Sequence, residues 1–316
     1  MISVVEDLII IGSGPAGLSA AIYAAREDFK PVLVSGLNAG GQLLLTTTVE
    51  NFPGFPEGVE GSELIDLMRK QAEKFGTKFV DGDVSRVDFS ARPFKVWVGE
   101  QLYEANSIIV ATGASAKWLG IESEKKFIGR GVSSCATCDA PFFKNKNVIV
   151  VGGGDTALED AIFLTKFASS VTIVHRRDAL RASKIMQERA FSNEKIKFVW
   201  NSVVEEVKGD AKVTGVRLKN IVTNETTEMP IDGVFVAIGY SPNTNVFKDQ
   251  LKLDEQGYII ATDEVKTEIE GIYVAGDVAD RVYRQAATAA ASGVKAALMV
   301  RDYLSKLKYE GGKNQQ

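Results

Sequence analysis

Short runs of apolar residues, each followed by a glycine-rich turn, set the pattern at the start of this chain. Residues 8–11 (LIII) are all apolar and show no polar alternation, which predicts a strand buried on both faces, as in a parallel sheet. The sequence GSGPAG follows at residues 12–17. Residues 18–26 then predict a helix and residues 31–34 a second strand. The chain therefore opens with a predicted β-α-β unit.

The same pattern returns about 140 residues further on. Residues 147–151 predict a strand, GGGDTA occupies 152–157, a helix is expected over 158–164, and a strand over 170–174. A G-x-G-x-x-G pattern alone is weak evidence, but between a strand and a helix it predicts dinucleotide binding. The first glycine permits the tight turn, the second lets the backbone approach a pyrophosphate, and the third small residue lets helix and strand pack. The helix N-terminus then faces the phosphates.

The two copies differ where a dinucleotide site meets the ribose, about 20 residues after the first glycine. In the second copy this position holds His175, Arg176 and Arg177, with Arg181 nearby and no carboxylate. Guanidinium groups suit a 2′-phosphate, so we predict NADPH rather than NADH; the alternative is a solvated basic loop. The first copy has Ser35-Gly36 and no acid, so it departs from the simple NAD pattern and its ligand stays open.

Composition narrows the functional class. The chain has 316 residues, 45% of them apolar and 25% charged, with a formal net charge of −4, which suits about two globular domains. Nothing in this balance suggests a nucleic-acid or polybasic membrane surface. No run of 18 apolar residues occurs, and the N-terminus lacks the basic region of a signal peptide. We therefore expect no membrane contact and a cytoplasmic location.

The cysteine content is a single C-x-x-C motif, Cys135 and Cys138, beside one histidine in the whole chain. A structural zinc site of Cys and His needs four ligands, so we predict no metal. The ring that such a disulfide closes is too small to stabilise the fold much, which favours a redox-active pair. Asp139 follows directly, and we expect it to exchange protons with the thiols, an exposed acid being the alternative. Serines at 133–134 are expected to cap a short helix that Pro141 interrupts.

These motifs together make the sequence similar to the low-molecular-weight, NADPH-dependent thioredoxin reductases of the pyridine nucleotide-disulfide oxidoreductase class. The resemblance runs from residue 8 to about 305. One departure is Asp139-Ala140, where many relatives have Asp-Gly. The matching pieces are GSGPAG, GGQL (40–43), ENFPGFP (50–56), ATGA (111–114), CATCDAPFF (135–143), GGGDTA, HRRDALRASK (175–184), AGDV (275–278) and YRQA (283–286).

The resemblance implies the fold and the domains. We expect an α/β protein of two Rossmann-like three-layer nucleotide-binding domains, the second inserted in the first. An FAD domain is expected over residues 1–116 and 246–316, and an NADPH domain with the cysteine pair over 117–245. Hinge segments are expected near 116–120 and 240–245. A long Ala-rich helix is predicted over about 285–306, followed by a frayed tail, 308–316. The resemblance also implies a homodimer.

It further implies the binding residues. The residues expected to hold FAD are Gly12, Ser13, Gly14, Pro15, Ala16, Gly17, Gly36, Gly40, Gly41, Gln42, Leu43, Asn51, Thr112, Gly113, Gly276, Asp277, Arg284, Gln285 and Ala286. Within this set Asp277 is expected to bind the ribityl chain. The residues expected to hold NADPH are Gly152, Gly153, Gly154, Asp155, Thr156, His175, Arg176, Arg177, Arg181, Ile238 and Gly239.

The implied reaction passes electrons from NADPH through FAD and the Cys135–Cys138 disulfide to thioredoxin or a thioredoxin-like small protein. The resemblance implies that Cys138 faces the flavin and that Cys135 attacks the disulfide of the partner. The spacing of the two cysteines alone does not decide which thiol has which role. Because the cysteines and the second glycine loop fall in one domain, they need a hinge rotation to reach the flavin in turn. Phe142 and Phe143 could dock the partner or pack in the core.

Two alternatives remain open at this stage. One is a flavoprotein reductase of another small redox protein, of the peroxide-reducing or ferredoxin type. The absence of an extra thioredoxin-like domain argues against the first, and the cysteine pair argues against the second. The other alternative is a nucleotide-binding redox sensor that is not an enzyme, which sustained turnover with a disulfide protein would exclude.

Overall fold

The computed structural model describes residues 4–37, 39–46 and 48–313, with side chains as far as residue 310. The chain divides into two compact units. Unit 1 ends at Ser115 and resumes at Ser241, and unit 2 is Ala116–Tyr240. The second crossing thus lies five residues before the predicted boundary at 245/246. The reason is that Asn243 bonds to unit 1: its Nδ2 donates to Thr112 O over 2.9 Å, and its own carbonyl oxygen accepts from Thr112 Oγ1 over 2.8 Å.

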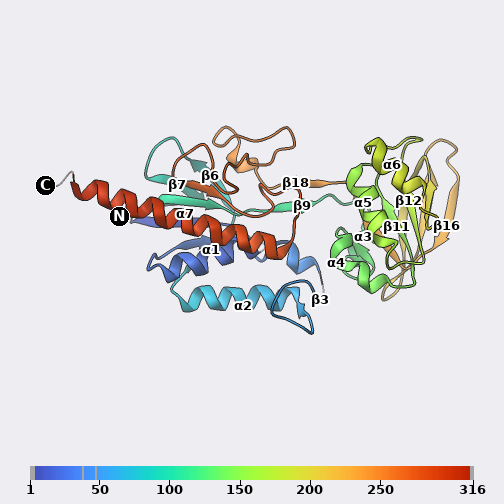
Figure 1. Cartoon of the computed structure of the whole chain (residues 1–316), viewed down its shortest axis with the longest axis horizontal. Helices are drawn as coiled ribbons and strands as arrows, with labels where there is room; N and C mark the ends of the chain where they lie inside the picture. The colour runs from blue at the N-terminus through green and yellow to red at the C-terminus, as the bar shows by residue number, and fades with distance from the viewer. Residues whose placement is uncertain (1–3, 38, 47, 314–316) are drawn as a thin grey trace. The chain divides into compact units, whose positions relative to one another are not determined.

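Unit 1 is built on a largely parallel sheet (Figure 1). Its strands are β5 (Lys78–Val80), β2 (Val32–Val34), β1 (Val5–Ile11) and β8 (Gln101–Val110), in that order. The second half of β8 pairs in parallel with β19 (Ile272–Val274), and its first half pairs antiparallel with β7 (Phe94–Val98), which pairs with β6 (Val84–Asp88). Because parallel strands point the same way, the loops after β1, β2, β8 and β19 emerge at one edge.

Strand β1 is buried on both faces, as its apolar run predicts. Leu8 and Ile10 pack into a core with helices α1 (Pro15–Arg26), α2 (Gly61–Lys74) and α7 (Ala286–Lys313), which lie together on one side of the sheet in Figure 1. Ile9 and Ile11 face a second core that includes side chains of β6, β7 and residues 247–278. All four side chains are at most 3% exposed.

Helix α7 packs closely on α1, because Gly293 has no side chain. A Cβ there would lie 2.0 Å from the carbonyl oxygen of Ala16, closer than any real contact. The helix continues to Lys313. The prediction of a frayed tail is therefore wrong for residues 308–313, which are helical. Residues 314–316 lie outside the described part of the chain.

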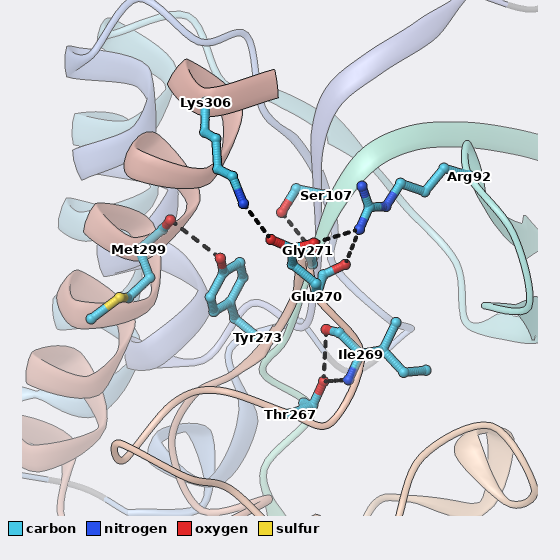
Figure 2. Close-up of polar contacts among 9 residues, drawn as sticks. All are labelled: Arg92, Ser107, Thr267, Ile269, Glu270, Gly271, Tyr273, Met299 and Lys306. Carbon is cyan, nitrogen blue, oxygen red and sulfur yellow. Dashed lines mark hydrogen bonds and ion pairs between the residues drawn. The ribbon is translucent and has the colours of Figure 1, made fainter. Parts of the chain in front are cut away.

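The amino end of β19 is anchored by polar contacts (Figure 2). Ser107 Oγ donates to the carbonyl oxygen of Gly271 over 2.7 Å. The Glu270 carboxylate pairs with Arg92 at 3.2 Å and with Lys306 at 3.3 Å. The ion pairs are exposed and so contribute little each, but together these bonds connect β19 to β8 and α7. The strand is thereby fixed at its amino end, and Gly276 and Asp277 follow directly after its carboxyl end.

Unit 2 repeats the plan of unit 1. Its parallel sheet has the order β10 (Val132–Ser133), β17 (Gly233–Val236), β11 (Asn147–Val151), β12 (Ser170–Val174) and β13 (Ile196–Val199). Helices α5 (Asp155–Leu164) and α6 (Lys184–Phe191) contribute to the core on one face. An antiparallel sheet of β14 (Ser202–Gly209), β15 (Val213–Asn220) and β16 (Thr226–Pro230) contributes to the core on the other. The predicted fold class, two three-layer α/β units with the second inserted, is confirmed.

The chain crosses between the units along two short strands that pair with each other, β9 (Ala114–Ala116) and β18 (Tyr240–Pro242). The remaining elements are short: β3 (Thr48–Val49), β4 (Val59–Glu60), α3 (Glu122–Phe127), α4 (Ala136–Asp139) and the 3-10 turns Gly41–Leu45, Ala140–Phe143 and Asn245–Phe247. None of the described helices has both the length and the apolar character needed to cross a bilayer.

Candidate functional site

The loop after β1 has the shape that its three glycines predict. Gly12 has φ +114°, and a Cβ there would meet Ala111 O at 2.3 Å. A Cβ on Gly17 would meet Gly12 O at 1.9 Å, so this glycine lets α1 pack against the loop. A Cβ on Gly14, by contrast, would meet no atom within 4 Å. The packing of the protein therefore requires Gly12 and Gly17, whereas Gly14 keeps open space at the N-terminus of α1, where a pyrophosphate binds.

Two neighbouring segments are tied to this loop through Ser13. Its hydroxyl donates to Ser35 O over 2.7 Å and accepts from Gly40 N over 3.0 Å. A Cβ on Gly41 would lie 3.8 Å from the Cα of Gly14. The predicted FAD residues 36 and 40–43 therefore adjoin residues 12–17, and the 3-10 turn that contains Gln42 and Leu43 begins beside the open space at Gly14.

Asp277 is the most perturbed acid of unit 1. The pKa of its carboxyl is raised to about 7, chiefly by burial and secondly by the charge of Asp280, while the charge of Arg284 opposes the rise. Its Oδ1 is buried without a hydrogen-bond partner in the described part of the chain. A buried carboxylate without a donor is costly, and the hydroxyl groups of a ligand would supply donors. Asp277 thus fits the expected contact with a ribityl chain.

The other predicted flavin residues meet near the start of α7. Asn51 Nδ2 donates to Gln285 Oε1 over 3.1 Å, which joins positions 234 residues apart. Arg284 has φ +48°, an uncommon value for a residue with a side chain, and Ala286 is the first residue of α7. After β8, Gly113 has φ +67° and Thr112 bonds to Asn243 as described above. These residues of unit 1 therefore fit a flavin dinucleotide. The individual contacts between them and the flavin stay a prediction.

The second glycine loop, after β11, matches the first. A Cβ on Gly152 would meet Ala237 O at 2.5 Å, whereas one on Gly154 would meet no atom within 4 Å. The loop again leaves open space at the N-terminus of α5, beside Gly154. Past β17, Gly239 has φ +106° and also has open space beside it, and Ile238 is partly exposed.

His175 lies under the second glycine loop. A Cβ on Gly153 would be 2.3 Å from its ring, which is 5% exposed. Its Nε2 lies 3.1 Å from Ala179 O. Burial lowers the pKa of His175 despite its backbone hydrogen bonds, and the charges of Arg181 and Arg177 lower it further. A neutral buried ring supports the loop; direct contact between His175 and a phosphate stays a prediction.

The arginines of the 176–181 segment are exposed, and this segment folds back on the glycine loop. Arg181 N donates to Gly153 O over 2.7 Å. Asp155 Oδ1 accepts from the backbone nitrogen and the hydroxyl of Ser183, at 2.9 and 2.7 Å, and these bonds lower the pKa of Asp155. The backbone of the segment that carries these arginines is thus held near the N-terminus of α5, where Asp155 and Thr156 begin the helix. Ser183 is a connection that sequence reasoning missed.

The cysteine pair is closed as a disulfide, with the two Cα atoms 5.3 Å apart. Cys135 itself caps α4, and no side chain caps the helix. The predicted serine cap is therefore wrong: Ser133 Oγ accepts from Cys135 N over 3.0 Å, one residue before the helix begins. Helix α4 ends at Asp139, and a 3-10 turn that contains Pro141 follows directly at Ala140–Phe143. No group of three or more metal-binding side chains occurs in the described ranges.

Asp139 is not an exposed acid. Burial raises the pKa of its carboxyl, and a hydrogen bond from Ser133 partly opposes the rise. One hydroxyl thus contacts both Cys135 and Asp139. Tyr240, at the edge of unit 2, donates its hydroxyl to Ser134 O over 2.7 Å. The sequence placed Tyr240 only in the second hinge segment. It gave no sign of the bond from Ser133 to Asp139 or of the bond from Tyr240 to Ser134, because neither contact has a local sequence signal.

The two phenylalanines after the cysteine pair have different surroundings. Phe143 is buried at 8% exposure and packs edge-on against Phe235, with ring centroids 5.1 Å apart. Phe142 is 39% exposed. Core packing therefore explains Phe143, and Phe142 alone remains available to a partner.

Comparisons with known proteins agree with this geometry. The family model for pyridine nucleotide-disulphide oxidoreductases matches residues 6–293. The chain belongs to the pyridine nucleotide-disulphide oxidoreductase family. A thioredoxin reductase of Rickettsia typhi is 52% identical over 308 residues, which are 96% of this chain and 99% of the relative. The members of this family use a flavin and a pyridine nucleotide, and so does this chain.

Two solved members of the family are equally identical to this chain. The thioredoxin reductase of Streptococcus pyogenes is 42% identical and matches with a TM-score of 0.92, covering 96% of this chain and 99% of that one. The thioredoxin reductase of Lactococcus lactis, in a form described as the FR conformation, is also 42% identical, with a TM-score of 0.64 over 95% and 99%. The resemblance inferred from the motifs is thus confirmed.

Proposed function

We propose that this chain is a thioredoxin-disulfide reductase that uses NADPH and FAD. The observation that carries the proposal is the disulfide between Cys135 and Cys138, which lies next to the half-buried Asp139. The chain that contains it belongs to the pyridine nucleotide-disulphide oxidoreductase family. Near-full-length relatives named thioredoxin reductase support thioredoxin as the partner. FAD rather than another flavin is supported by the dinucleotide loop at 12–17, and NADPH by the exposed Arg176, Arg177 and Arg181.

The residues of unit 1 hold the flavin. Residues 12–17 bind its pyrophosphate, Asp277 its ribityl hydroxyls, and the segments at Asn51 and 284–286 its ring. The chemistry supplied by FAD, when bound to these residues, would be the transfer of an electron pair from NADPH to the Cys135–Cys138 disulfide. Reduction of the disulfide to two thiols takes up that electron pair and two protons.

The residues of unit 2 perform the exchange. The thiolate of Cys135 attacks the partner disulfide, so that a mixed disulfide forms and one partner thiolate leaves. Cys138 then attacks Cys135, which releases the second partner thiolate and closes the Cys135–Cys138 disulfide again. Asp139, with its raised pKa, holds a proton at higher pH than an exposed acid would. It therefore donates to the departing thiolate and takes the proton back from the next thiol.

We further infer that the units rotate relative to one another during turnover. The cysteine pair and the NADPH loop both belong to unit 2, whereas the flavin loops belong to unit 1. Only the paired strands β9 and β18 carry the chain across within the described residues. The two solved relatives support this inference, since equal identity with unequal TM-scores is what a change in domain arrangement between relatives produces.

Two parts of the proposal depend on the resemblance alone. Pairing into a homodimer stays a prediction. The exposed side chains of Val282 and Tyr283 offer apolar surface that such a dimer could bury. A cytoplasmic location also stays a prediction.

The test is an anaerobic titration of the purified protein with NADPH, followed by flavin absorbance. If the disulfide lies in the electron path, the protein accepts two electron pairs per flavin, and a Cys138→Ser variant accepts one. Steady turnover with thioredoxin then identifies the enzyme. Uptake of a single pair by the unaltered protein would exclude the proposal and favour a simple flavin reductase. Two-pair uptake without turnover of any disulfide protein would favour a redox sensor.

A further inference from the structure

The first dinucleotide site lacks an acid where its second strand ends, and the tertiary structure supplies one. Strand β2 ends at Val34, and Ser35-Gly36 follow it. Strand β5 pairs with β2 in parallel, with Val34 opposite Val80, so the two strands end level. The loop after β5 brings Asp83 onto the end of β2, where its Oδ1 accepts a hydrogen bond from Leu37 N over 2.9 Å.

Gly36 allows this approach. It has φ +76°, and a Cβ at this position would lie 3.3 Å from Asp83 Oδ1, so any side chain there would crowd the carboxylate. Ser35, the preceding residue, accepts the hydrogen bond from Ser13 in the pyrophosphate loop. The Asp83 carboxylate is therefore connected through Leu37, Gly36 and Ser35 to the loop that binds the pyrophosphate.

The carboxylate is free to take a ligand. Asp83 is exposed, and within the part of the chain that the structure describes its carboxylate takes part in none of the ion pairs and accepts from Leu37 N. Leu37 N occupies one lone pair, and a carboxylate can accept about four hydrogen bonds in all. Dinucleotide sites use an acid at the end of the second strand to accept the 2′-hydroxyl of the adenosine ribose.

We propose that Asp83 accepts a hydrogen bond from the 2′-hydroxyl of the adenosine ribose of FAD. The inference deepens the proposed function and rests on FAD being the cofactor of unit 1. It also explains how two similar sites select different dinucleotides. A carboxylate repels the 2′-phosphate of NADPH from unit 1, whereas the arginines at 176, 177 and 181 attract it in unit 2.

The test measures affinity and does not depend on turnover. Apoprotein is titrated with FAD and with the FAD analogue that carries 2′-deoxyadenosine, and flavin fluorescence reports binding. The variants are Asp83→Asn, whose amide oxygen can still accept from Leu37 N, and Asp81→Asn. Asp81 is an exposed acid in the same loop, and no role is assigned to it.

The unaltered protein and Asp81→Asn should bind FAD about tenfold more tightly than the analogue, as expected for a hydrogen bond to a charged group. Asp83→Asn should bind FAD about tenfold more weakly and should discriminate against the analogue by less than about twofold. If Asp83→Asn keeps the tenfold preference, or if the unaltered protein has none, the role of Asp83 is wrong. If the unaltered protein binds NADPH in place of FAD in unit 1, the proposed function itself fails.

Discussion

We predict that the affinity for FAD depends on pH, because Asp277, the residue proposed to bind the ribityl hydroxyls, has a raised pKa. Without cofactor its carboxyl has a pKa of about 7, because it is buried and lies near the charge of Asp280. A ribityl hydroxyl that donates to the carboxylate stabilises the ionised form and lowers this pKa. Binding then releases a proton, so affinity for FAD rises with pH as far as about 7 and is constant above it.

The magnitude follows from the size of the shift. Each pH unit between the bound pKa and about 7 changes the affinity by at most about tenfold, or about 1.4 kcal/mol. If binding restores the ordinary pKa of about 4, the full linkage is about three units, or about 4 kcal/mol. Between pH 5 and pH 7 the affinity should therefore rise by up to about fiftyfold, since half of the unbound carboxyl is still protonated at pH 7.

The assay is titration of apoprotein with FAD at several pH values between 5 and 8, with fluorescence as the signal. Asp277→Asn cannot ionise, so its weaker affinity should be nearly independent of pH. Asp280→Asn removes the like charge and should move the rise to lower pH. The reasoning is refuted if the unaltered protein binds FAD equally well across this range, or if Asp277→Asn keeps the same slope.

Three further predictions concern other parts of the molecule. Ser133→Ala removes a bond that lowers the pKa of Asp139, so the pH profile for reduction of thioredoxin should shift to higher pH. Arg176→Gln and Arg177→Gln should each raise the KM for NADPH by about ten- to hundredfold, the loss of a charge-assisted hydrogen bond, and leave the KM for NADH unchanged. Gly293→Ala should destabilise unit 1 by about 1–3 kcal/mol in thermal unfolding, because its Cβ would overlap Ala16 O.

Each of these has a matched control. Ser134→Ala leaves the Asp139 contact intact and should keep the pH profile. Arg189→Gln changes an exposed arginine of α6 and should leave the preference for NADPH as it is. At the exposed position 291, Ala291→Gly should cost about 1 kcal/mol from helix propensity alone. The first prediction is contradicted if Ser133→Ala leaves the pH profile unshifted. The second is contradicted if the arginine variants raise the KM for NADPH and for NADH equally, and the third if Gly293→Ala makes the protein more stable.

The sequence alone determined the elements whose causes are local. An apolar run without alternation indicates a strand covered on both faces, and β1 and β11 have such cores on each side. The glycines at 12–17 and 152–157 are required by contacts with the strand just before them and the helix just after them. Because these partners are near in sequence, the conformations of both loops could be predicted. The cysteine pair is separated by only two residues, so its closure needs no long-range information.

Only the tertiary structure decided contacts between distant segments. Phe142 and Phe143 are adjacent and chemically identical, yet Phe235 buries only Phe143. His175 is a plausible phosphate ligand by sequence, but the fold places Gly153 over its ring. The missing acid of the first site comes from Asp83, 46 residues from Leu37 along the chain. Such contacts depend on which strands pair and where they end, and this information is distributed over the whole sheet rather than held in any short motif.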